Sequence, residues 1–298
     1  MIKMTYASLV NRVPKIMIER APNYMQWAGF AVGEQTSLRR KKLMRTMLTT
    51  VVDYNLIEAN DHVMVAISGG KDSYTLLDLL LSAQKKAPHP FKITAVHLDQ
   101  QQPGYDGQPL KDYLISHDIP HVIVSENTYS VVVDKTKPGG TFCSLCSRMR
   151  RGILYREATK IGANKIALGH HRDDALETLM LNLIYAGKLS AMPPKYLTDD
   201  GHFHVIRPLI ETAERDIISY AKAKNFPILP CNLCGAQEGL KRQRMKELLS
   251  QLEEEKADVR SVMLHALKNI NPAHLLDKRF LDGEMAEPMP RKKLKVIS

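Results

Sequence analysis

The four cysteines of this 298-residue chain occur as two Cys-x-x-Cys pairs, Cys143 with Cys146 and Cys231 with Cys234. In a chain without a secretory pattern, such pairs indicate metal binding or redox chemistry and not a disulfide framework. The long stretch between the pairs is unusual for structural zinc, whose pairs usually lie about 15–20 residues apart. Spacing alone therefore leaves an iron–sulfur cluster, a zinc ion and disulfide or persulfide chemistry open.

A second reactive stretch, Ser-Gly-Gly-Lys-Asp-Ser at 68–73, directly follows the apolar run 63–67. Its adjacent glycines leave backbone N–H groups uncovered at the positive end of a predicted helix, where phosphate binds. It is not the common phosphate-binding loop, because Val65 and Asp72 stand where that motif needs Gly and Ser or Thr. An ordinary strand-to-helix turn is the alternative. The candidate nucleotide contacts are Ser68, Gly69, Gly70, Lys71, Asp72 and Ser73, with Asp72 suited to a magnesium ion.

Polar residues also end two further apolar runs. Asp99 follows the run 92–98, and Gly-His-His-Arg-Asp-Asp at 169–174 follows the run 165–168. Histidines beside aspartates bind metals or move protons. The structural alternatives are a neutral, hydrogen-bonded histidine and an aspartate that caps a helix beginning at Ala175. The candidate residues in these segments are Asp99, Gly169, His170 and Asp173.

Strands that alternate with helices must position these residues. Apolar runs predict strands at 63–67, 92–98, 121–124, 165–168, 204–208 and 226–229. Helical spacing predicts helices at 38–57, 74–83, 110–117, 143–161, 175–185 and 215–224, and a charged helical region from 235 to about 270. This order predicts an α/β fold with a doubly wound parallel sheet, in which ligands bind at the carboxyl ends of the strands. All the candidate segments fall at such ends.

Composition indicates a soluble protein with a polyanionic partner. The hydrophobic content is 44%, the charged content is 25%, and no run of about 18 apolar residues predicts a membrane span. With no secretory pattern at the N-terminus, we expect a cytoplasmic location. The net charge is +10, and basic residues gather near 39–45, 148–156 and 241–244. Any one cluster could be a solvated helix face, but together they favour RNA or DNA.

The motifs form an ordered set. They are Ser68–Ser73, the segment 143–155 with its Cys-Ser-Leu-Cys-Ser-Arg start, Gly169–Asp174, Arg-Pro-Leu at 207–209 and Pro-Cys-Asn-Leu-Cys-Gly at 230–235. This set resembles the TtcA family of tRNA 2-thiocytidine synthetases, which are PP-loop (pyrophosphate-loop) ATP pyrophosphatases with an adenine nucleotide alpha hydrolase-like fold. The resemblance covers about residues 38–277. It implies an N-terminal extension at 1–37, a catalytic domain at 38–235 and a helical, basic, tRNA-binding region at 236–298.

The resemblance also implies roles for individual residues. The PP-loop would hold ATP, with Asp72 near magnesium. Cys143, Cys146 and Cys234 would hold a [4Fe-4S] cluster whose fourth iron carries sulfide, and Cys231 would be a possible relay thiol. Arg150 and Asp173 match positions near the reacting base in the thiouridine-forming relatives, which have a lysine where this chain has Arg150.

The implied reaction is ATP-dependent 2-thiolation of a cytidine in the tRNA anticodon loop, at tRNA position 32. A cysteine desulfurase would supply the sulfur, and the enzyme would be a homodimer with no membrane contact. A tRNA 2-thiouridine synthetase or another PP-loop tRNA-modifying adenylase, such as a lysidine synthetase, is the alternative enzyme. A zinc-stabilised RNA-binding protein without catalysis is the alternative from another class.

Overall fold

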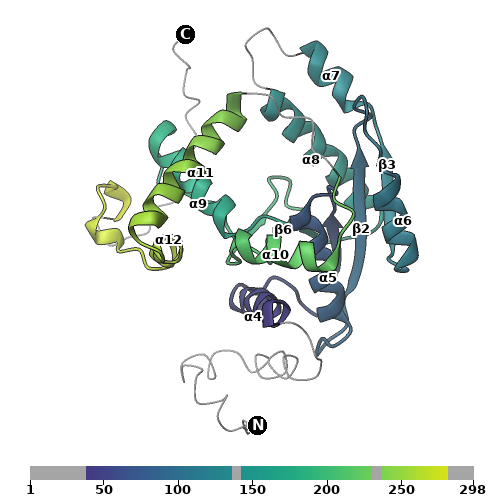
Figure 1. Ribbon diagram of the computed structural model, residues 1–298, viewed down its shortest axis with the longest axis horizontal. Helices are drawn as coiled ribbons and strands as arrows, with labels where there is room; N and C mark the ends of the chain where they lie inside the picture. The colour runs from purple at the N-terminus through teal and green to yellow at the C-terminus, as the bar shows by residue number, and fades with distance from the viewer. Residues whose placement is uncertain (1–37, 136–141, 230–236, 281–298) are drawn as a thin grey trace, which may run out of the picture.

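The computed structural model describes residues 38–135, 142–229 and 237–280. A twisted six-stranded sheet forms its centre, with the strand order β3-β2-β1-β4-β6-β5 (Figure 1). The strands are β1 (His62–Ala66), β2 (Lys92–Asp99), β3 (His121–Ser125), β4 (Lys165–Ala167), β5 (Lys195–Leu197) and β6 (His204–Ile206). All neighbours pair in parallel except β5, which runs antiparallel to β6 at the edge.

The order of the strands confirms the predicted doubly wound architecture. The chain moves from β1 outward to β2 and β3 and then returns to place β4 on the other side of β1. The point between β1 and β4 is therefore the topological switch point, outside which such sheets bind ligands. The PP-loop follows β1 and the segment 169–174 follows β4, so both lie at this point.

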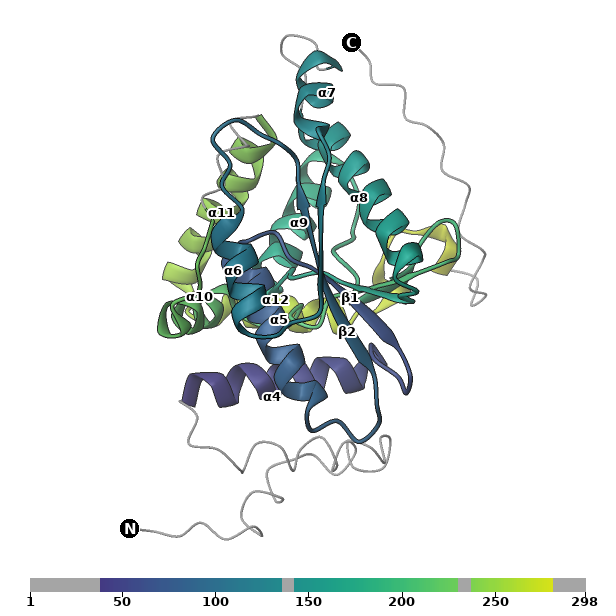
Figure 2. The same cartoon turned by 90° about the vertical axis from the view of Figure 1, so that its right-hand side faces the viewer.

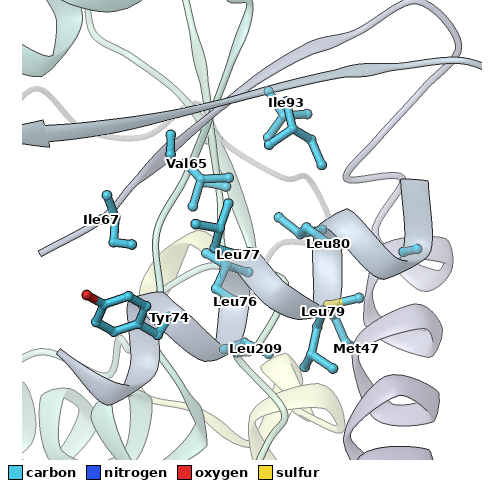
Figure 3. Close-up of a cluster of buried hydrophobic side chains, with 14 of the residues drawn as sticks. Met47, Val65, Ile67, Tyr74, Leu76, Leu77, Leu79, Leu80, Ile93 and Leu209 are labelled. Atoms are coloured by element: carbon cyan, nitrogen blue, oxygen red, sulfur yellow. The ribbon is translucent and has the colours of Figure 1, made fainter. Parts of the chain in front are cut away.

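Alternating side chains of β1 divide the core into two layers. Val63 and Val65 pack into the larger cluster, together with the leucines of α5 (Figure 3), whereas Met64 packs into a smaller cluster on the opposite face. Helices α4 (Leu38–Asp53), α5 (Lys71–Gln84), α6 (Gln108–Ser116) and α10 (Glu214–Lys224) supply side chains to the first layer. Helix α8 (Phe142–Lys160) covers the second face, as Figure 2 shows.

The C-terminal part of the described chain packs on a helix that leaves the switch point. This helix is α9 (Arg172–Tyr185), and α11 (Gln237–Glu255) and α12 (Val259–Lys268) both contact it. The remaining elements are α7 (Thr128–Lys135) and two short 3-10 turns at Pro272–His274 and Lys278–Phe280. Among the described residues, no helix has both the length and the apolar character that crossing a membrane requires.

Several element predictions were wrong in detail. Segment 226–229 is not a strand, because Pro227 has no N–H and the Leu229 N–H donates to the Gly69 carbonyl (3.0 Å) instead of to a ladder. The first helix ends at Asp53 and not at residue 57. Neither α7 nor the three-residue β5 was predicted, since both are too short to give a clear periodic pattern.

Candidate active site at the switch point

The PP-loop is held in shape by its own serines. The Ser68 N–H donates to Ser73 Oγ (3.2 Å), and the Ser73 hydroxyl donates to the Gly70 carbonyl (2.9 Å). Gly70 is the extended residue that precedes α5, with φ −84° and ψ 158°. The first-turn N–H groups of α5 therefore face the loop interior without a side-chain cap, which is the arrangement that binds a phosphate.

Two glycines let other segments approach the PP-loop closely. Gly69 has φ +82°, and a Cβ there would lie 2.7 Å from Leu229 Cδ1. A Cβ on Gly169 would lie 3.0 Å from the backbone carbon of Asp72. A side chain at Gly69 would be strained by the positive φ, and one at Gly169 would press on the backbone of Asp72. The Gly169 contact therefore places the backbone of the loop after β4 directly against the loop after β1.

Lys71 lies in a chain of charges that reaches the C-terminal helices. Its Nζ is 3.0 Å from Asp72 Oδ2 and 3.1 Å from Glu214 Oε1, and Lys246 Nζ of α11 is 2.9 Å from Glu214 Oε2. Burial alone would raise the pKa of Glu214, but the hydrogen bonds from Lys246 and Lys71 lower it to about 2. Glu214 is thus a fixed anion that holds the PP-loop lysine.

Asp72 has one carboxylate oxygen available to a cation. Its Oδ1 is buried and has no hydrogen-bond partner among the described residues, and it lies 3.7 Å from His171 Nε2. Within the described part of the chain, no group of three or more His, Cys, Asp or Glu side chains has the geometry of a metal site. A single carboxylate fits magnesium that keeps waters and phosphate oxygens as its other ligands.

The two histidines after β4 have different roles. The Arg207 Nε–H donates to His170 Nδ1 (3.2 Å), which leaves the neutral ring with its proton on Nε2. Burial and the nearby Arg207 charge lower the pKa of His170 to about 4. His171 caps α9: its ring accepts the Asp174 N–H, and the Asp174 carboxylate accepts the His171 N–H. The prediction that an aspartate caps this helix is met by Asp174 as the N3 residue of the capping box, but the predicted start at Ala175 was wrong, because α9 begins at Arg172 with His171 as its N-cap.

Asp173 is buried in a structural network. Its Oδ2 accepts the N–H of Glu214, the first residue of α10 (2.8 Å), and its Oδ1 accepts Arg260 of α12 (3.0 Å) and Arg172 (3.3 Å). Burial opposes ionisation, but these partners together lower the pKa of Asp173. The carboxylate therefore ties three helices together beside the switch point, and its catalytic role stays a prediction.

Asp99 and Gln100 lie at the carboxyl end of β2, the strand beside β1. Asp99 accepts the Gln101 N–H (2.8 Å) and the Ser125 hydroxyl (3.2 Å), so it stabilises the turn after β2. The Cys146 thiol of α8 lies 3.2 Å from Gln100 Oε1. Gln100 directly follows β2, which pairs with β1, so this sulfur lies near the carboxyl end of the strand beside β1. Arg150, one turn later in α8, is exposed.

The remaining cysteine predictions fall mostly outside what the structure describes. Cys143 lies in the first turn of α8, three positions before Cys146, but its side chain is not described. Cys231 and Cys234 lie outside the described residues. Leu229, two positions before Cys231, is the nearest described residue and is bonded to the PP-loop.

Several side chains around the site have no recognisable pattern in the sequence. Glu214, Lys246 and Arg260 act through contacts between helices that are distant in sequence. His97 is buried behind the PP-loop: its Nδ1–H donates to the Ile67 carbonyl (2.8 Å), and the Tyr105 hydroxyl bonds its Nε2 (2.5 Å). Burial lowers the pKa of His97, which stays neutral in this position.

Comparison with known proteins agrees with this geometry. The family model described as the PP-loop domain matches residues 39–229. A tRNA-cytidine(32) 2-sulfurtransferase of Tolumonas auensis is 54% identical over 243 residues, which cover 82% of this chain and 80% of the relative. The protein of that name from Azotobacter vinelandii is also 54% identical, over 82% of this chain and 89% of its own length.

A solved structure has the same fold. The U34-tRNA thiolase NcsA from Methanococcus maripaludis, determined with its [4Fe-4S] cluster, superposes with a TM-score of 0.62. The two chains are 22% identical, and the match covers 78% of each. At this identity the likeness supports the shared PP-loop architecture of the sheet and its helices.

Proposed function

This chain belongs to the tRNA-cytidine(32) 2-sulfurtransferase family of PP-loop proteins, and from this premise we propose that it thiolates a cytidine of tRNA in an ATP-dependent reaction. The observation that carries the proposal is the pair of loops whose backbones meet at the switch point. It offers N–H groups, Lys71 and one available oxygen of Asp72 within a single site. These are the groups that a protein needs to bind a nucleoside triphosphate together with magnesium.

The PP-loop residues would bind and orient ATP. The N–H groups at the start of α5, with Lys71, would hold the pyrophosphate portion, and Asp72 Oδ1 would bind magnesium. Neutral His170 would donate its Nε2–H to the nucleotide. The cytosine O2 attacks the α-phosphate, the bond to the β-phosphate breaks, and pyrophosphate leaves. The N–H groups at the start of α5, together with Lys71, would stabilise the negative charge on the departing pyrophosphate.

The cysteines would hold the group that supplies the sulfur nucleophile. Cys143, Cys146 and Cys234 would hold a [4Fe-4S] cluster, and Cys146 Sγ lies 3.2 Å from the Oε1 of Gln100, which follows the strand paired with β1. When bound, such a cluster would supply sulfide as the nucleophile. Attack of sulfide on C2 of the adenylated base would form the C–S bond as the C–O bond breaks, and AMP would leave with the original O2. Cys231 would serve as a relay thiol.

Arg150 and Asp173 would act near the base. Exposed Arg150 is one turn after Cys146 in α8, so its guanidinium can reach the RNA phosphate or the base. Asp173, with both oxygens hydrogen-bonded, would position the loop and not transfer protons. The basic residues would bind the RNA backbone. A cysteine desulfurase as sulfur source, a homodimer and a cytoplasmic location complete the proposal.

Two measurements test this proposal. Purified without air, the protein is expected to contain about four irons per chain, and Cys234→Ala to lose them while Cys231→Ala keeps most. With tRNA added, wild type is expected to release pyrophosphate and AMP from ATP. Ser73→Ala is expected to abolish this release and keep the iron. Zinc without iron, or release of orthophosphate with ADP, would contradict the proposal and favour a non-catalytic RNA-binding protein or another ATPase.

A further inference from the structure

The exposed end of α9 carries a surface that the site at the switch point does not use. Every residue from 183 to 190 is exposed, although this segment contains four large apolar side chains. Their exposed fractions are 51% for Leu183, 49% for Ile184, 51% for Tyr185 and 60% for Leu189. Successive side chains of a helix point about 100° apart, so these residues surround the end of α9. A concentration of exposed apolar side chains in one short segment is a candidate interaction site.

The turn after α9 is fixed and not loose. The Asn182 side chain donates to the Ser190 carbonyl (2.8 Å) and lies 3.0 Å from its hydroxyl, and the Asn182 carbonyl accepts the N–H groups of Ala186 and Lys188. Gly187 supplies the positive φ of +57° that this turn requires. The apolar side chains are therefore presented on an ordered backbone, and binding there costs little conformational entropy.

The chain segment that forms this surface carries basic residues and no acidic ones. No Asp or Glu occurs between Thr178 and Thr198, and Lys188 lies within the turn. Lys241 of α11, which packs beside α9 (Figure 1), places its Nζ 4.9 Å from the centre of the Tyr185 ring. An aromatic ring, apolar neighbours and ammonium groups together are the combination that binds single-stranded nucleic acid, with bases stacked and phosphates paired.

The distance from the switch point to this surface can be spanned by a short single strand of RNA. Helix α9 begins at the switch point with Arg172 and has 14 residues, so it carries Tyr185 about 20 Å away. A stacked strand rises about 3.4 Å per nucleotide, so roughly six nucleotides would cover this distance. A loop of RNA with one base in the active site can therefore extend along α9.

We propose that the α9 surface, formed by Leu183, Ile184, Tyr185, Lys188 and Leu189 with Lys241, binds unpaired bases of the RNA whose cytidine is modified. A base stacks on the exposed part of Tyr185, the apolar side chains support its neighbours, and the two lysines pair with the adjoining phosphates. This inference rests on the proposed function, since it assumes that the substrate is an RNA loop.

The test uses the full-length protein and a fluorescent anticodon stem-loop RNA. Tyr185→Ala is expected to weaken RNA binding about tenfold, within the range of base–aromatic stacking, and Tyr185→Phe to bind nearly as wild type. Lys241→Gln is expected to bind weaker and to reduce the slope of log affinity against log salt by about one. Leu189→Ser gives a second variant at an exposed turn position, with an expected loss of severalfold.

Matched controls lie on α6, away from α9 in Figure 1. Ile115→Ala and Lys111→Gln change an exposed apolar and an exposed basic residue, and both are expected to leave RNA affinity unchanged. An unchanged affinity in both Tyr185→Ala and Leu189→Ser would overturn the inference. So would a change from dimer to monomer in these variants with RNA affinity retained, because the surface would then bind a second copy.

Failure of the proposed function is a separate outcome. If wild type binds the stem-loop and Tyr185→Ala does not, but no thiolated base forms with ATP and sulfide, the surface stands and the thiolation proposal fails. If wild type thiolates the RNA and Tyr185→Ala does so with an unchanged KM for RNA, the inference about the α9 surface is contradicted and the thiolation proposal is kept.

Discussion

At the residue scale, the site depends on two glycines at which another segment of the chain approaches the backbone closely. Gly69 is limited twice, by its φ of +82° and by Leu229 Cδ1 at 2.7 Å from an added Cβ. Gly169 is limited by the backbone of Asp72. These contacts explain why a phosphate-binding surface can be built from two separate loops: each glycine lets one backbone lie directly on the next segment.

Gly69→Ala is expected to weaken ATP binding at least tenfold, because the new methyl group forces both the φ angle and the contact with Leu229 to change. Combining it with Leu229→Ala removes the two shortest contacts, with Cδ1 and Cγ, but leaves the Cβ contact at 3.1 Å and the φ penalty, so partial recovery is expected. Equilibrium binding of ATP measures the effect. Full affinity in Gly69→Ala would show that the loop tolerates a different conformation.

His170 makes the stability depend on pH. Its pKa is lowered from 6.5 to about 4, so below pH 6.5 the unfolded chain binds a proton that the folded chain does not. Its share of the stability is therefore lost as pH falls from 6.5 toward 4. Urea unfolding at pH 7.5 and pH 5 is expected to show a loss about 2 kcal/mol smaller in His170→Asn than in wild type. An equal loss in both proteins would contradict the assignment.

At the element scale, the C-terminal helices and the catalytic loops are one structure. Arg260 of α12 is buried against Asp173, which in turn caps α10, and Lys246 of α11 reaches the PP-loop through Glu214. Helix α12 is also held at its end, where Lys268 pairs with Glu211. If α11 or α12 moves when RNA binds, the positions of Lys71 and of the segment after β4 would therefore change as well.

Arg260→Ala is expected to destabilise the protein by about 3–5 kcal/mol, because it leaves the buried Asp173 carboxylate with fewer partners. Arg215→Ala is the control: Arg215 is exposed and lies 4.0 Å from Glu253, so a change within about 1 kcal/mol is expected. Urea unfolding measures both. Similar small losses in the two variants would show that the Asp173 network contributes little.

The sequence predicted most elements but not their contacts. The continuous apolar run of β1 and the helical spacing of the leucines in α5 are both local patterns, and the strand, the helix and the PP-loop domain that they predicted are confirmed. The pair of Arg260 with Asp173 joins residues 87 positions apart and has no local pattern. Segment 226–229 looks like a strand because it is apolar, but Pro227 and the bond from Leu229 to Gly69 give it a different role.

At the scale of the whole molecule, the topology places two chemical functions at one point. The strand order puts the loops after β1 and β4 side by side, and Cys146 of α8 contacts Gln100, which directly follows β2 at the same edge of the sheet. Activation by ATP and delivery of sulfur would then act on one base without its release. The positive net charge of +10 favours an RNA substrate held at that edge.

The central claim is tested most directly by the base that the protein makes. Iron-containing protein, kept without air, is incubated with ATP, inorganic sulfide and tRNA, and the tRNA is digested to nucleosides and analysed by mass spectrometry. The account predicts 2-thiocytidine that forms only when ATP is present and that is lost in Ser73→Ala. Unmodified tRNA, or 2-thiouridine in place of 2-thiocytidine, would contradict it.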